Sequence, residues 1–123
     1  MSRKESAVTF LSMASSGQVE GAYARFIAPE FIHHNPYFRG DRESLKSAMI
    51  EAHRTSPNKR FEVKRSFEDG DFVITHSLVV RADPGDPDVA VVHIFKFEGD
   101  KVVELWDLGQ LLSPDSPNEN GPF

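Results

Sequence analysis

Cysteine is absent from this chain of 123 residues, and tryptophan occurs only once. The lack of cysteine excludes disulfides, thiolate nucleophiles and zinc–thiolate sites, and it fits a reducing cytoplasm, where we expect the protein to reside. No apolar run approaches the roughly 20 residues that a membrane-spanning helix needs, so no membrane association is expected. The chain also lacks a block of like charge and a basic, aromatic strand of the RNA-binding kind. Its formal net charge of −5 argues further against nucleic acid as a partner.

What the chain contains is ordinary for one globular domain. Hydrophobic residues make up 39% of it and charged residues 27%. A chain of this length can bury a single core, and it shows no internal repeat. We therefore expect one domain over residues 1–112. Residues 113–123 are rich in proline, asparagine and serine, and we expect a tail there that covers the surface or reaches a partner chain.

Apolar residues recur at helical spacing in three segments of the first half of the chain, beginning at Ala7, Val19 and Leu45. Gly17 should end the first helix, and Pro29 should stop the second. The third helix is expected to begin after Asp41, which is suited to its N-cap, and to run to about residue 55, because Ser-Pro-Asn at 56–58 breaks it. The chain between the second and third helices, up to residue 40, is expected to be irregular.

Four strands are predicted in the second half, at residues 61–67, 72–82, 91–98 and 102–112. The Asp-Gly dipeptide at 69–70 is a strong hairpin signal, and a turn there sets Val63 opposite His76. His76 would then lie on the apolar face of its strand, next to Leu78. Pairing of the second and third strands sets Leu78 opposite His93. His76 and His93 would therefore be diagonal neighbours on one face.

The most informative segment is the hairpin at residues 89–112. One face of its first strand carries Val91, His93, Phe95 and Phe97, and the matching face of its second strand carries Val103, Leu105 and Asp107. A three-residue loop at 99–101 sets His93 opposite Asp107 and places Lys96 beside Glu104 on the other face. A two-residue loop at 99–100 has good turn chemistry but mixes apolar and charged residues on each face, so we predict the longer loop.

A carboxylate and an imidazole that share an apolar face suggest a site. Burying either group alone is costly, but together they can hydrogen-bond, which fixes the imidazole tautomer and prepares it for proton transfer. The alternative is a buried pair that only satisfies itself in the core of the sheet.

Helices followed by antiparallel strands predict an α+β fold, in which three N-terminal helices pack on one face of a curved antiparallel sheet. The hollow between the helices and the sheet would form a pocket. Its candidate polar residues are His34, His76, His93 and Asp107, with Tyr23, Tyr37, Arg65 and Gln110 as additions. His33 and His53 are assigned to the surface, and Trp106 to packing in the core or in a dimer.

The order of these elements, the segment His34-Asn35-Pro36 and the strand at residues 102–107 resemble the SnoaL-like branch of the nuclear-transport-factor-2-like superfamily. The closing residues 118–123, Asn-Glu-Asn-Gly-Pro-Phe, resemble the tail of a bacterial subgroup labelled SnoaL-like aldol-condensation proteins. The resemblance covers essentially the whole chain. It implies a cone-shaped α+β barrel, a homodimer formed through the sheet and a pocket at the mouth of the cone.

The resemblance also implies roles for two residues. SnoaL polyketide cyclases use an aspartate near the end of a late strand as acid and base for an intramolecular aldol closure. Asp107 matches that aspartate, and His93 matches a pocket residue one strand earlier. The same scaffold carries ketosteroid isomerases, epoxide hydrolases, dehydratases and proteins without catalysis, so the fold alone does not name the reaction.

The residues are consistent with acid/base chemistry beside a carbonyl, of the aldol cyclase, isomerase or dehydratase type, without a cofactor. Asp107 would remove a proton next to the carbonyl, and His93 or His34 would donate to the enolate oxygen. The expected wall for a small, apolar substrate consists of Phe95, Phe97, Leu105 and Leu78. Two other classes stay open. One is a ligand-binding or dimerising module without chemistry. The other is a metal site of three histidines with Asp107, which matches no ligand motif, so no metal is expected.

Overall fold

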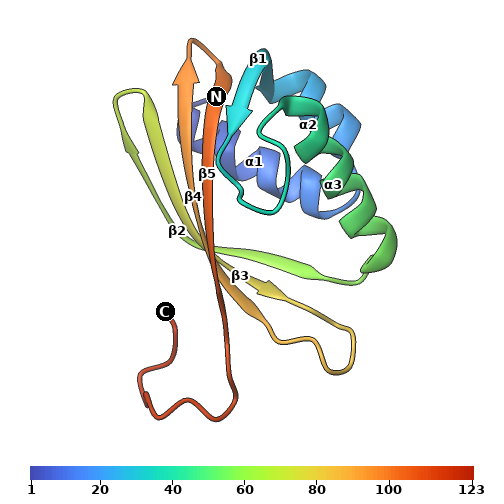
Figure 1. Cartoon of the computed structure of the whole chain (residues 1–123). Coiled ribbons are helices and arrows are strands. Elements are labelled where there is room, and N and C mark those ends of the chain that lie inside the picture. The colour runs from blue at the N-terminus through green and yellow to red at the C-terminus, as the bar shows by residue number, and fades with distance from the viewer.

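One curved, open sheet of five strands forms the centre of the protein, and three helices cover one of its faces (Figure 1). The computed structural model describes residues 1–123. The helices are α1 (Arg3–Ser15), α2 (Val19–Phe26) and α3 (Arg42–Thr55). The strands are β1 (Ile27–His33), β2 (Arg60–Asp69), β3 (Phe72–Val80), β4 (Val89–Glu98) and β5 (Lys101–Leu111). Their order in the sheet is β1-β5-β4-β3-β2, and the predicted α+β class is confirmed.

Side-chain caps define where α1 and α3 begin. The hydroxyl of Ser2 accepts a hydrogen bond from the backbone N–H of Glu5, and the Glu5 carboxylate accepts one from the backbone N–H of Ser2. Asp41 accepts from the backbone N–H of Ser44, as predicted for the N-cap of α3. None of the three helices is both long enough and apolar enough to cross a membrane.

Strand β1 corrects the expectation of irregular chain before residue 40. It lies at the edge of the sheet and runs parallel to β5, with His33 paired to Leu105. Pro29 is tolerated in β1 because an edge strand can lack one N–H and because the pairing is irregular around this residue.

The β2–β3 hairpin forms, but its register differs from the predicted one. Asp69 pairs with Phe72 across a two-residue turn. The turn lies at residues 70–71 and not at 69–70, and this sets Arg65 opposite His76, where Val63 was expected. A bulge lies beyond this pair, between Val63 and Arg65. The buried residues of β3 alternate with His76, so His76 lies on the uncovered face of the sheet. Apolar residues occupy both faces of this strand, and their pattern therefore did not distinguish the faces.

The β4–β5 hairpin has the predicted register at the end that carries the candidate site. His93 pairs with Asp107, and Lys96 pairs with Glu104. The predicted three-residue loop is wrong, because the turn has two residues and a bulge in β5 absorbs the extra one. The bulge combines a favourable Gly-Asp turn with the register that keeps each face of the hairpin uniform.

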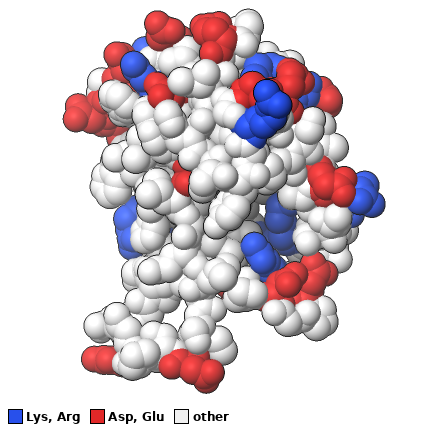
Figure 2. Space-filling view, in the orientation of Figure 1, with Lys and Arg blue, Asp and Glu red and all other residues white.

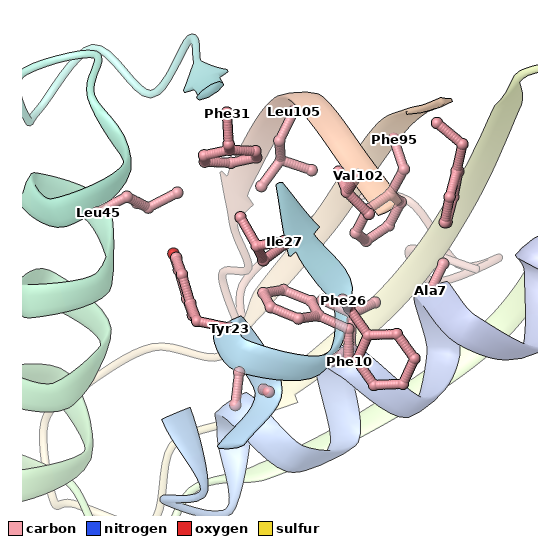
Figure 3. Packing of buried hydrophobic residues seen from close by; sticks show 14 of the residues in the cluster. Ala7, Phe10, Tyr23, Phe26, Ile27, Phe31, Leu45, Phe95, Val102 and Leu105 are labelled. Atoms are coloured by element: carbon pink, nitrogen blue, oxygen red, sulfur yellow. The ribbon is translucent and has the colours of Figure 1, made fainter. Parts of the chain in front are cut away.

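The hydrophobic core lies between the helices and the sheet. Phe10 of α1 packs edge-on against Phe95 of β4, with 6.2 Å between ring centroids, and Tyr23 of α2 packs edge-on against Phe31 of β1 at 6.4 Å. Figure 3 shows Tyr23 between α2 and Leu45 of α3. The lower end of the sheet and the tail extend beyond the helices in Figure 1, so the core fills only part of the covered face.

The tail returns towards the sheet without forming a helix or strand. Residues 112–123 contain neither element. The ring of Phe123 lies 4.6 Å from that of His76, and the ammonium group of Lys64 lies 5.7 Å from the Phe123 ring. The end of the tail therefore packs on the uncovered face of the sheet.

Candidate active site

Three polar side chains lie at one level across the covered face of the sheet. Thr75 of β3 pairs with His93 of β4, and His93 pairs with Asp107 of β5. Thr75 is fully buried, His93 is 7% exposed and Asp107 is half-buried. Neighbouring strands lie about 4.8 Å apart, so the row extends over roughly 10 Å.

His93 is neutral at physiological pH. Burial lowers its pKa to about 4, because a charged ring would lose its hydration, and the nearby negative charge of Asp107 opposes this effect only in part. The ring centroids of Phe61 and Phe95 lie 6.1 and 5.8 Å from that of His93. In this apolar setting the ring offers one nitrogen as a donor and the other as an acceptor.

The two carboxylate oxygens of Asp107 have different surroundings. Its Oδ2 accepts a hydrogen bond of 2.8 Å from Nδ2 of Asn35. Its Oδ1 is buried without a partner, and so is Nδ1 of His93. An unsatisfied buried polar atom is costly, and these two atoms belong to residues directly opposite each other. The imidazole and the carboxylate are therefore potential partners for each other.

A cleft of about 800 Å³ opens beside Asp107. It is lined by the loop residues 34–37, by Arg81, by Val89 and Val91 of β4, and by the second half of β5. The pairing of β1 with β5 ends at Leu105. Beyond this residue, the edge of β5 that is not paired with β4 borders the cleft. Asp107 thus borders the cleft at the open edge of the sheet.

Asn35 joins the loop to Asp107 and is a site residue that was not predicted from the sequence. Besides the bond to Asp107, its Oδ1 accepts a hydrogen bond of 2.9 Å from the backbone N–H of Tyr37. This closes a turn within the loop. An Asn-Pro dipeptide is a turn signal, and it was the available clue to this position.

His34 lies at the rim of the cleft, but its ring nitrogen is already engaged. The ring stacks on that of Trp106 with 4.9 Å between centroids and 9° between planes. Its Nε2 lies 2.6 Å from Oε2 of Glu104. This geometry does not favour the expected donation from His34 to a substrate oxygen.

His76, Leu78 and Gln110 lie on the uncovered face of the sheet, opposite to the face of His93. This placement corrects the expectation that they line the pocket. Nδ1 of His76 contacts Nη1 of Arg65 at 2.5 Å. The misplacement of His76 and Leu78 has one cause, the face assigned to β3 from its ambiguous apolar pattern.

The aromatic candidates divide between the core and the rim of the cleft. Tyr23 and Phe95 are fully buried in the core, whereas Tyr37 is 85% exposed and lines the cleft. The hydroxyl of Tyr23 contacts Sδ of Met49 at 3.5 Å, and burial raises the pKa of Tyr23, so the phenol stays protonated. Tyr37 is therefore the tyrosine that a ligand in the cleft can touch directly.

Two further histidines were assigned to the surface. His53 is half-buried on α3. His33 is only 5% exposed, and both of its ring nitrogens bond to the backbone of the loop that follows β1. The assignment of His33 to the surface is therefore corrected.

The geometry does not favour the alternative of a metal site. His34 and His76 are directed to the uncovered face, whereas His93 and Asp107 lie on the covered one. No three side chains of the ligand types His, Asp and Glu converge anywhere in the structure.

Comparison with known proteins places these features in a family. A family model described as a SnoaL-like domain matches residues 7–105. The match includes His93 and ends two residues before Asp107. No curated protein matches the sequence.

Several solved structures share the fold. AclR, a proposed hydroxylase from Streptomyces galilaeus, superposes with a TM-score of 0.76 at 19% identity, over 88% of each chain. A proposed polyketide cyclase from Acidithiobacillus ferrooxidans gives 0.72 at 23% identity, over 89% of this chain and 91% of that one. IdmH, a proposed polyketide cyclase from Streptomyces antibioticus, gives 0.73 at 15% identity, over 89% and 92%. At such identities these structures support the fold and not one reaction. The chain belongs to the SnoaL-like domain family and has its nuclear-transport-factor-2-like fold.

Proposed function

We propose that this protein is a cofactor-independent enzyme that moves a proton next to the carbonyl group of a small, largely apolar substrate. Aldol cyclases, isomerases and dehydratases share this step. The observation that carries the proposal is the position of Asp107, in the wall of the cleft and between Asn35 and the neutral His93.

Asp107 is the proposed base. Its carboxylate takes a proton from the carbon next to the carbonyl, and the electron pair of that C–H bond passes to the carbonyl oxygen as an enolate forms. Nδ1 of His93 and Oδ1 of Asp107 have no partner in the structure, and a donation from the neutral ring to this oxygen during the reaction would hold the carboxylate without bringing a positive charge. The amide of Asn35 has a second N–H, and because Asn35 lines the cleft, this group is a candidate donor to the enolate oxygen.

The cleft indicates the kind of substrate. Its volume of about 800 Å³ is typical of a pocket for a drug-sized molecule. Its apolar lining consists of Pro36, Val89, Val91, Trp106, Leu108 and Leu111, together with the ring of Tyr37. The apolar residues predicted from the sequence to line the pocket do not line this cleft. Phe95, Phe97 and Leu105 are buried in the core, and Leu78 lies on the other face of the sheet. Arg81 is the one cationic residue of the lining, and it would attract a second oxygen of the substrate.

Exchange of carbon-bound protons tests the proposal directly. 2-Tetralone, a small apolar ketone, is incubated with the protein in D2O, and the loss of its C1 protons is followed by NMR. Wild-type protein should accelerate the exchange over buffer, and Asp107→Asn should lower the rate about 100-fold or more. Asp115→Asn makes the same chemical change in the exposed tail and should exchange at the wild-type rate. Equal rates for wild type and Asp107→Asn would refute a role for Asp107 as base.

Binding without chemistry is the second candidate function. It is favoured by the burial of Oδ1 of Asp107 and by the bond from Asn35 to Oδ2, since a carboxylate held in this way can simply fix the loop. A binding module would shift the indole N–H signal of Trp106 when 2-tetralone enters the cleft, yet it would not accelerate proton exchange.

We also propose that the protein forms a homodimer through the uncovered face of the sheet. One apolar row crosses this face from β2 to β5 and consists of Phe67, Ile74, Ile94 and Trp106. Phe72 and Leu108 extend it with further exposed apolar surface. Figure 2 shows a broad uncharged area over the strands, with charged side chains mostly at its margins. Exposed apolar surface of this extent is typical of an interface.

Light scattering on a size-exclusion column tests the dimer. Phe67→Lys introduces a charge into the apolar row and should give a monomer. Ile50→Lys is the matched control, because Ile50 is also exposed but lies on α3, and this variant should stay dimeric. A wild-type monomer, or the same mass for both variants, would contradict the proposed interface.

A further inference from the structure

The loop that lines the cleft is held at both ends by one residue, His33. Its Nδ1 accepts a hydrogen bond of 3.1 Å from the backbone N–H of Asn35, near the start of the loop. Its Nε2 lies 2.6 Å from the carbonyl oxygen of Arg39, near the end. The backbone N–H of His33 also donates to the carbonyl of Gly40 at 3.1 Å. The ring therefore bridges the two ends of the loop.

These partners define the protonation state of His33. A carbonyl oxygen only accepts, so Nε2 must carry the proton that is donated to Arg39. A backbone N–H only donates, so Nδ1 must be unprotonated to accept from Asn35. One form of the ring, the neutral tautomer with hydrogen on Nε2, satisfies both partners.

Besides His33, a few polar contacts hold the loop: an antiparallel bridge pairs Ile32 with Asp41, and the Asn35 side chain bonds to Tyr37 and Asp107. Residues 36–40 are all exposed, so burial does not fix them. The backbone N–H of His34 donates to the carbonyl of Leu105, and within the loop Phe38 donates to the carbonyl of Asn35 at 3.4 Å. The orientation of Asn35 thus depends on the ring of His33 more than on packing.

We propose that His33 is a positioning residue for Asp107 and acts through Asn35. The connection has two steps: the ring fixes the backbone of Asn35, and the Asn35 amide then donates to Oδ2 of Asp107 at 2.8 Å. His33 does not line the cleft, so it touches no substrate. Its role deepens the proposed function, and its importance for catalysis rests on that function.

The first test is made on the free protein by NMR. The carboxyl ¹³C signal of Asp107 is compared in wild type, His33→Ala and Asn35→Ala. Both variants should move this signal to a similar new position, and the double variant should move it no further. His33→Gln can keep one of the two ring bonds and should give an intermediate shift. His53→Gln, a half-buried histidine outside the loop, should leave the signal unchanged.

A merely structural role for His33 predicts a different result. In that case His33→Ala would lower the stability of the protein while the Asp107 signal stayed at its wild-type position, and the proposal would be overturned. Additive shifts in the double variant would overturn it as well, because they would mean that His33 and Asn35 act independently. If His33→Ala does not fold, His33→Gln and Asn35→Ala still decide the question.

Kinetics separate this inference from the proposed function. In the 2-tetralone exchange assay, His33→Gln should lower kcat about tenfold, the factor expected for the loss of one hydrogen bond, and leave KM unchanged. An unchanged kcat together with a shifted carboxyl signal would overturn the catalytic importance of His33. If wild type shows no exchange at all while the carboxyl signal shifts as expected, the proposed function fails and the positioning of Asp107 by His33 stands.

Discussion

Acid should destabilise this protein through His93. The ring is about nine-tenths buried, and its pKa in the folded protein is lowered to about 4, against about 6.5 for a free histidine. At a pH between these two pKa values, His93 binds a proton in the unfolded chain but not in the folded protein. Stability is therefore lost as the pH falls from about 6.5 to about 4 and is fully present above this window.

The size of the effect follows from the two pKa values. At pH 5 the contribution of His93 to the free energy of unfolding is lower than at pH 7.5 by about 2 kcal/mol, and below pH 4 the loss approaches about 3 kcal/mol. Because the ring has little contact with solvent, screening by water and salt should reduce these figures only slightly.

Urea unfolding at a series of pH values measures this contribution. Other groups titrate in the same range, so the wild type is compared with His93→Gln, which has no titratable ring at this position. The difference in unfolding free energy between the two proteins should change by about 2 kcal/mol from pH 7.5 to pH 5. His53→Gln removes a histidine from α3 and should keep the acid sensitivity that His93 confers. A difference between wild type and His93→Gln that stays constant with pH would refute the reasoning.

Three further changes test other parts of the structure. Asp107→Asn removes the negative charge that opposes the effect of burial, so NMR titration should give His93 a pKa below its wild-type value of about 4. Gly17→Ala should destabilise the protein by about 1–3 kcal/mol in chemical denaturation, because the residue has a φ of 93° and its Cβ would lie 2.5 Å from Nε2 of His53. Asp41→Ala removes the N-cap of α3 and should cost about 1 kcal/mol in the same assay.

The pair of His93 and Asp107 could be predicted because several local signals agree. In the correct register, apolar residues face apolar residues on one side of the hairpin, and Lys96 meets Glu104 on the other. The bulge in β5 could not be predicted in the same way. The turn chemistry favours a two-residue loop, whereas uniform faces require one more residue between the paired strands. An extra residue inside β5 satisfies both conditions, but the alternation of apolar and polar residues does not reveal it.

The face of β3 could not be derived from its sequence, because the usual contrast between covered and uncovered faces is missing. Its covered face carries Thr75 and Ser77, whereas its uncovered face carries Ile74 and Leu78. The covered face also carries the buried Val73, so apolar residues occur on both faces and the ordinary alternation is blurred. Thr75 and Ser77 lie on the same face as His93, and the exposed Ile74 lies on the face of the proposed dimer interface.

Failure to predict β1 also explains why His33 was missed. Successive residues of a strand point to opposite faces, so once β1 is extended to His33, the buried Phe31 places His33 inside and Ile32 outside. The chain leaves the strand at His34, whose ring stacks on Trp106 on the outer side. Two adjacent histidines therefore have unrelated tasks, and the sequence alone presents them as a pair. The local signal for β1 is weak because Pro29 interrupts it, and its pairing with β5 bridges about 70 residues of intervening chain, a distance over which hydrophobic periodicity carries no information.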